Sequence, residues 1–189
     1  MNHVIEHLES YVGEIAGGHS FLPDGSKAPF HVVQASDGPI PGLTTFATLG
    51  LCRFPLARLG ACEDDHMVRQ ELVMVAPTDA VPANLPALVQ QVGMGALARG
   101  AAFSNGEIIG PKGALFQGFE PTALVAAQPY CFPEGFAAVD DSEERHVEFL
   151  WLVPLHTDEV TLIQSQGWEG FERFLAHESV YYTDYRRSV

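Results

Sequence analysis

The stretch FLWLV, residues 149–153, decides the fold because it is apolar without interruption. Charged residues precede it at Glu143, Glu144 and Arg145, and Pro154 follows it directly. A short apolar run with such flanks is typical of a strand that is buried on both faces at the centre of a sheet. Because proline has no N–H to donate, we expect strand pairing to stop at Pro154.

A surface helix is predicted directly after this strand. Thr157 can cap its N-terminus, and Asp158 and Glu159 occupy the first turn, where carboxylates favour the positive end of the helix dipole. Gly167 is the expected stop. A last short helix should follow, with an aromatic face that we assign to the core rather than to a ligand site; its apolar residues are Trp168, Phe171, Phe174 and Leu175.

The rest of the chain contains two further predicted helices and five predicted strands. Helical spacing of apolar residues predicts a first helix over 3–16 that ends at Gly17-Gly18. Asn84 should cap a second helix that reaches Gly100 and is weakened by Gly93 and Gly95, with an earlier end or a kink at these glycines as the alternative. The expected strands are 30–34, 43–51, 68–76, 107–109 and 122–126.

These elements predict an α+β protein. Strands predominate in the first half, and the strict alternation of strands and helices that marks a doubly wound sheet is missing. No internal repeat and no linker divides the chain. We therefore expect residues 1–189 to be a single domain with a mainly antiparallel or mixed central sheet, packed by several helices.

Composition narrows the classes of partner. The 189 residues carry a formal net charge of −14, which repels nucleic acid and anionic lipid and favours encounter with a basic protein. No apolar run is long enough to cross a bilayer, and the N-terminus lacks the features of a signal peptide. Three cysteines without pairing motifs fit a reducing compartment. We expect a cytoplasmic protein that binds neither nucleic acid nor membrane.

Three motifs contain residue types that could bind a metal ion or a phosphate. His3, Glu6 and His7 match H-x-x-E-H, an inverted zinc-protease pattern, but they lie at a terminus and have no clear third ligand. The segment Cys62–His66 offers metal ligands without a paired half elsewhere, and Gly106–Lys112 lacks the register of a phosphate loop. We therefore predict no catalytic residue, no cofactor and no metal site, with a metal-dependent hydrolase of unrecognised type as the alternative.

Several segments, in order along the chain, resemble the suppressor of fused-like domain, especially its short bacterial members. They are core and turn signatures: residues 7–9, 45–51, 69–74, 110–111, 149–155, 158–159 and 184–189. The resemblance implies a protein-binding module. In the animal protein a second, C-terminal domain follows, and an extended segment of a transcription factor is held. Because this sequence ends at Val189, we expect neither that domain nor that role here.

Bacterial members of this family are thought to act often as immunity proteins that neutralise toxins, and the acidic charge fits a basic toxin. The leading prediction is therefore a non-enzymatic module that occludes a basic toxin domain. A regulatory scaffold that binds an extended peptide by edge-strand pairing is the second alternative. The oligomeric state is open. The predicted partner-binding residues lie in two acidic clusters: Glu63, Asp64 and Asp65 in the first, and Asp140, Asp141, Glu143 and Glu144 in the second.

Overall fold

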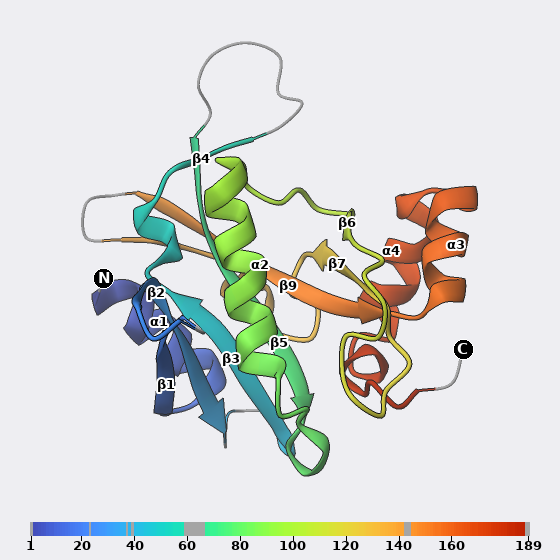
Figure 1. Cartoon of the computed structure of the whole chain (residues 1–189), viewed down its shortest axis with the longest axis horizontal. Helices are drawn as coiled ribbons and strands as arrows, with labels where there is room; N and C mark the ends of the chain where they lie inside the picture. The colour runs from blue at the N-terminus through green and yellow to red at the C-terminus, as the bar shows by residue number, and fades with distance from the viewer. Residues whose placement is uncertain are drawn as a thin grey trace.

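A computed structural model describes residues 2–22, 24–36, 38, 40–58, 67–141 and 145–187. These residues form one sheet of nine strands with four α-helices around it (Figure 1). The strands are β1 (Ile15–Phe21), β2 (Lys27–Ser36), β3 (Leu43–Leu49), β4 (Leu56–Ala57), β5 (Met67–Pro77), β6 (Glu107–Ile109), β7 (Ala123–Ala127), β8 (Ala138–Asp140) and β9 (His146–Leu155). The helices are α1 (Asn2–Val12), α2 (Leu85–Arg99), α3 (Thr157–Gln166) and α4 (Trp168–His177).

The sheet is mixed, with the order β1-β2-β3-β5-β9-β7-β6. β4 pairs with β5 and β8 with β9 off this path. All these pairs are antiparallel except β5 and β9, which run parallel with Arg69 opposite Val147. The predicted α+β class with a mixed sheet packed by helices is confirmed.

β9 is an interior strand next to β5 at the centre of the sheet, and its side chains alternate between two cores. Phe149, Trp151 and Val153 face one core, while Leu150 and Leu152 face the other, and all five are buried. This alternation follows from the two-residue period of a strand. The prediction of a strand buried on both faces is confirmed.

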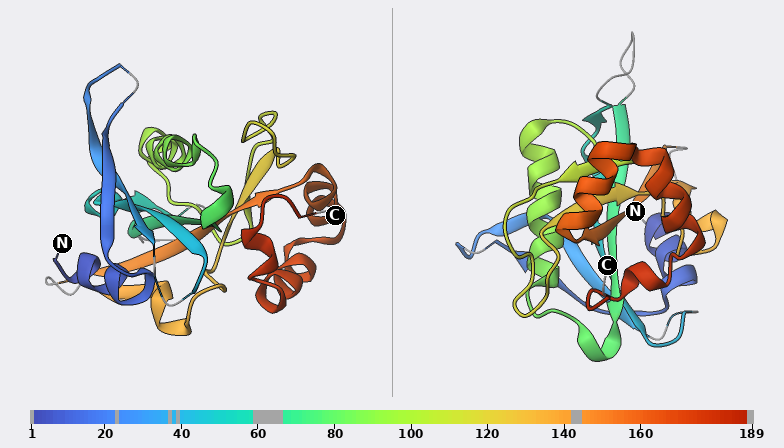
Figure 2. Two further views of the ribbon diagram at one scale, coloured as in Figure 1. Left: turned by 90° about the horizontal axis from the view of Figure 1, so that it is seen from below. Right: turned by 90° about the vertical axis from the view of Figure 1, so that its right-hand side faces the viewer.

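The helices close the two cores from opposite sides of the sheet. α2 buries Leu85, Val89 and Val92 against one face, and α1, α3 and α4 pack on the other (Figures 1 and 2). The hairpin of β1 and β2 extends away from this body (Figure 2). None of the described helices is both long enough and apolar enough to span a bilayer.

Pairing does not stop at Pro154, contrary to expectation. Pro154 lies opposite Leu124 in the ladder with β7, and β9 continues to Leu155. The carbonyl oxygen of Leu155 accepts a hydrogen bond from Thr122 N of the β7 side, so the carbonyl of Pro154 and its missing N–H face away from β7. On that side β5 is paired with β9 only up to Trp151. The ladder therefore needs no donor at Pro154.

Two predicted helix boundaries are also wrong. The first helix ends at Val12, because Gly13 adopts φ 85° and donates to Glu9 O; Gly17 and Gly18 instead lie in β1. The third helix is capped by His156, not Thr157, and Glu159 Oε2 accepts a hydrogen bond from His156 N at 2.7 Å. The stop at Gly167 is confirmed.

Two expectations about helix interiors need correction. α2 runs unbroken through Gly93 and Gly95 to Arg99. The aromatic face of α4 is only partly core: Phe171 is buried, whereas Phe174 is 62% exposed.

Candidate protein-binding surface

β5 and β9 run parallel, and each follows one of the two predicted acidic clusters in the sequence. The first cluster directly precedes β5, and the second directly precedes β9. Because parallel strands begin at the same edge of a sheet, the chain enters both strands at one end of the molecule, at the upper left of Figure 1. We call this end, from Arg58 and Met67 to Asp140, Arg145 and Glu148, the strand-start end.

The structure describes two of the seven predicted partner-binding residues, and their environments differ. Asp140 ends β8 with its side chain 71% exposed, and its Oδ1 lies 3.1 Å from His146 Nδ1. Asp141 is buried, and its carboxylate accepts hydrogen bonds from the backbone and side chain of Arg145, the latter at 2.7 Å. Asp140 is thus available to a partner, whereas Asp141 is bound to Arg145. Glu63, Asp64, Asp65, Glu143 and Glu144 lie outside the described residues.

An ion pair crosses the sheet at the strand-start end. Arg58 follows β4, and its Nη2 lies 2.6 Å from the Oε1 of Glu148 on β9. Next to this pair Met67 begins β5 opposite Ala57, with half of its surface exposed. An exposed apolar side chain at this end can serve as the apolar anchor of a contact surface.

A buried carboxylate braces the same strand. Glu71 on β5 is fully buried and accepts hydrogen bonds from Thr48 Oγ1 at 2.5 Å, Gly50 N at 2.7 Å and Cys52 N at 3.3 Å. Burial raises the pKa of Glu71 above its ordinary value, and these hydrogen bonds oppose the shift. It holds the short helix Leu51–Arg53 against β5 and so positions β4. A polar pair, Gln70-Glu71, inside an apolar strand was the available sequence signal.

The residues of the candidate metal-binding motif near the N-terminus contact protein groups or solvent. The Nε2 of His7 lies 3.1 Å from Phe136 O, and its ring packs against Tyr11, Phe136 and Phe149. His3 and Glu6 are exposed on α1. Within residues 2–58, 67–141 and 145–187, apart from the few single positions left out, no three His, Cys, Asp or Glu side chains group as metal ligands. The segment 62–66 lies outside the described residues.

The ends of the sheet offer a second kind of surface. β1 and β6 are the terminal strands in the sheet order. β1 is mostly exposed, with Phe21 67% exposed, and its sequence IAGGHSF has no Asp, Glu, Lys, Arg or Pro to discourage pairing. This is the exposed edge that a scaffold working by strand addition requires.

Comparison with known proteins gives one family. The model of the family described as "Suppressor of fused protein (SUFU)" matches residues 26–188. None of the curated proteins matches the chain.

Several solved structures share the fold. The structure described as the Sufu–Fu complex aligns with a TM-score of 0.70 at 16% identity, covering 98% of this chain and 89% of that one. A putative SUFU homolog from Neisseria gonorrhoeae FA 1090 aligns with a TM-score of 0.68 at 16% identity, covering 99% and 94%. Drosophila Suppressor of Fused aligns with a TM-score of 0.69 at 17% identity, and this chain spans half its length.

The family match extends over most of the sheet and over all three helices after α1, and the structural matches cover the same elements. The resemblance predicted from the core and turn signatures is confirmed. The chain is a member of the suppressor of fused family.

Proposed function

We propose that this protein is a non-enzymatic protein-binding module, and that it neutralises a basic toxin domain by occluding it. One observation supports the proposal: β5 and β9 run parallel and start at the same edge of the sheet, and each directly follows one of the acidic clusters in the sequence. The formal charge of −14 would steer a basic partner toward this acidic protein. Met67 supplies the exposed apolar anchor at the same end. A relative has been crystallised in complex with Fu, a protein partner, and this supports binding as the general role.

The fold also supports treating residues 1–189 as one unit of binding. α1, α3 and α4 share one core on the same sheet whose other face packs α2. We therefore propose a single domain that presents the strand-start end to its partner.

The test begins with capture of the partner from native lysate and its identification by mass spectrometry. Association rates are then measured over a series of salt concentrations for two variants, each of which removes three charges. One variant replaces Glu63, Asp64 and Asp65 by the corresponding amides, and the other does the same at Asp140, Glu143 and Glu144. Asp141 is kept because it is bound to Arg145. We expect each variant to associate roughly tenfold more slowly and with a weaker dependence on salt.

A matched control removes the same charge elsewhere. Asp158, Glu169 and Glu178 are exposed on α3, on α4 and directly after it, and their amide variant should associate nearly as fast as the wild type. Equal slowing in the control and the cluster variants would show a general charge effect and would reject the strand-start end as the interface.

A second candidate function is a scaffold that binds an extended segment along β1. The exposed, uncharged edge of β1 favours it. Hydrogen exchange with the captured partner separates the two: amide protection over 15–21 with none at the strand-start end would favour strand addition. Protection around 67–69 and 145–148 would favour occlusion.

A further inference from the structure

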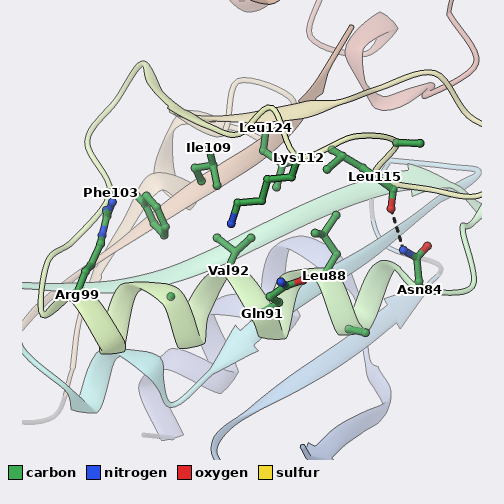
Figure 3. Close-up of a pocket in the computed structure, with 13 residues that line it drawn as sticks. Asn84, Leu88, Gln91, Val92, Arg99, Phe103, Ile109, Lys112, Leu115 and Leu124 are labelled. Atoms are coloured by element: carbon green, nitrogen blue, oxygen red, sulfur yellow. Dashed lines mark hydrogen bonds between the residues drawn. The ribbon is translucent and has the colours of Figure 1, made fainter. Parts of the chain in front are cut away.

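A cavity of about 430 Å³ lies between α2 and the segment 103–124 (Figure 3). Leu88 and Val92 of α2 form one wall, and Ile109, Leu115 and Leu124 form the other. This volume and this apolar lining are those of small-molecule sites. The cavity lies on the face of the sheet that α2 covers. Binding of a small molecule there would not depend on the protein partner proposed above.

Both ends of the cavity are bridged. At one end Asn84 Nδ2 donates a hydrogen bond to Leu115 O at 2.8 Å, joining the start of α2 to the opposite wall. At the other end the guanidinium of Arg99 stacks over the Phe103 ring, 4.0 Å from its centroid. Figure 3 shows these two bridges on either side of the space. A polypeptide could not run through such a space, so the fitting occupant is a compact molecule.

A glycine keeps the helix wall open. Gly95 lines the cavity, and a Cβ added there would meet no atom within 4 Å. Gly93 differs, because its Cβ would lie 2.6 Å from Phe30 Cζ, so close packing requires that glycine. A glycine inside a helix costs about 1 kcal/mol relative to alanine. Close packing therefore does not require glycine at the exposed position 95, and a larger side chain there would have free space along the cavity wall.

The charged side chains on the cavity wall are both cations, in a chain with net charge −14. Arg99 is already satisfied by Glu107 and by the carbonyls of Ala101 and Ala102. Lys112 is an exposed residue of the opposite wall, and its side chain extends over the space with its amine above Val92 (Figure 3). Among the described residues, the Lys112 amine has no ion-pair or hydrogen-bond partner, while its backbone N–H is anchored to Thr122 O at 3.1 Å.

We propose that this cavity binds a small monocarboxylate with an apolar body, whose carboxylate pairs with Lys112. The apolar walls would hold an alkyl or aryl body. A single ammonium matches the single charge of one carboxylate, whereas a phosphate ester carries about two negative charges at pH 7. Phosphate esters and peptides are therefore poor occupants.

The test uses 4-phenylbutanoate and octanoate as probes, with their neutral amides as matched ligands, and calorimetry on the full chain. We expect saturable binding of the acids and roughly tenfold weaker binding of the amides. Lys112→Gln should weaken the acids to the level of the amides and leave the amides unchanged. The chain has two lysines, so Lys27→Gln on β2 is the control and should change nothing.

Gly95→Leu fills the cavity from a position with free space and should abolish binding of acids and amides alike. A second measurement uses the same two lysines: the acids should protect Lys112, but not Lys27, from an amine-acylating reagent. The proposal is overturned if neither acid binds at millimolar concentration, if acids and amides bind equally, or if Lys112→Gln or Gly95→Leu leaves acid binding unchanged.

Discussion

Arg187 and Glu159 form a buried ion pair across 28 positions of the chain, with Nη2 and Oε2 separated by 2.7 Å and side-chain exposures of 0% and 5%. Arg187 also donates to Pro154 O at 2.6 Å, and its guanidinium lies over the Tyr182 ring. Glu159 accepts the N–H of His156 through the same oxygen. The pair therefore joins the C-terminal segment to the end of β9 and the start of α3.

Removing this pair on one side should destabilise the protein strongly. Arg187→Met leaves the Glu159 carboxylate buried without its counter-ion, and we expect a loss of about 3 kcal/mol in the free energy of unfolding, measured by urea denaturation. The neighbouring Arg186 is the control, because it is half-exposed and pairs at the surface with Asp184. Arg186→Met should cost no more than about 0.5 kcal/mol. Similar losses in the two variants would contradict the structural role of the buried pair.

His156 should make the protein less stable in mild acid. Burial, and then the charge of Arg187, lower the pKa of His156 below its ordinary value of 6.5. The unfolded chain therefore binds a proton more readily than the native state. The stability that neutral His156 contributes is fully present above pH 6.5, and it is lost as the pH falls from 6.5 toward the lowered pKa. Urea denaturation over a pH series should show a smaller decline for His156→Asn than for the wild type. An unchanged decline would exclude His156 as its source, and His3→Asn, on the exposed side of α1, serves as control.

Glu71 should act in the opposite direction. Its raised pKa means that the native state holds a proton more tightly than the unfolded chain, so this contribution is complete below the ordinary glutamate pKa and is lost as the pH rises through the raised pKa. Glu71→Gln cannot titrate, and the stability of the wild type relative to this variant should decline with rising pH. Paired denaturation curves from about pH 4 to about pH 8 measure the difference. A constant difference would show that Glu71 keeps one protonation state throughout.

The two glycines inside α2 should respond oppositely to alanine. Gly93→Ala forces a methyl group against Phe30 and should cost about 1–3 kcal/mol in unfolding free energy. Gly95→Ala meets open space and should stabilise by about 0.5–1 kcal/mol through helix propensity. Thermal unfolding followed by circular dichroism compares the two. A loss of stability in Gly95→Ala would indicate that α2 needs flexibility at that position.

Local sequence patterns predicted much of the fold. The apolar run at 149–153 identified the central strand, the apolar stripe after Asn84 identified α2, and Gly167 marked the end of α3. The predicted end of the central strand was wrong because a residue distant in sequence contacts it. β9 continues past Pro154 because its backbone there faces Arg187 and not a neighbouring strand. Gly13, rather than Gly17 and Gly18, ends α1 because it adopts the positive φ that terminates the helix.

The candidate surface stays a prediction. Both acidic clusters were visible as charge runs, but sequence spacing could not show that Asp141 turns inward to Arg145 while Asp140 stays exposed. The Arg58–Glu148 pair joins residues 90 positions apart and leaves no local signal. Only the polar pair Gln70-Glu71 within an apolar strand pointed to a buried carboxylate.

The sequence by itself determined that this is an acidic α+β protein with a doubly buried central strand, because burial imprints a period of two or 3.6 residues on nearby positions. The tertiary structure alone decided that β5 and β9 run parallel, that Arg187 meets Glu159, and that Lys112 extends into a cavity beside α2. Each of these depends on which distant segments share a core. That choice minimises exposed apolar area and unpaired polar groups over the whole chain, and no single stretch encodes it.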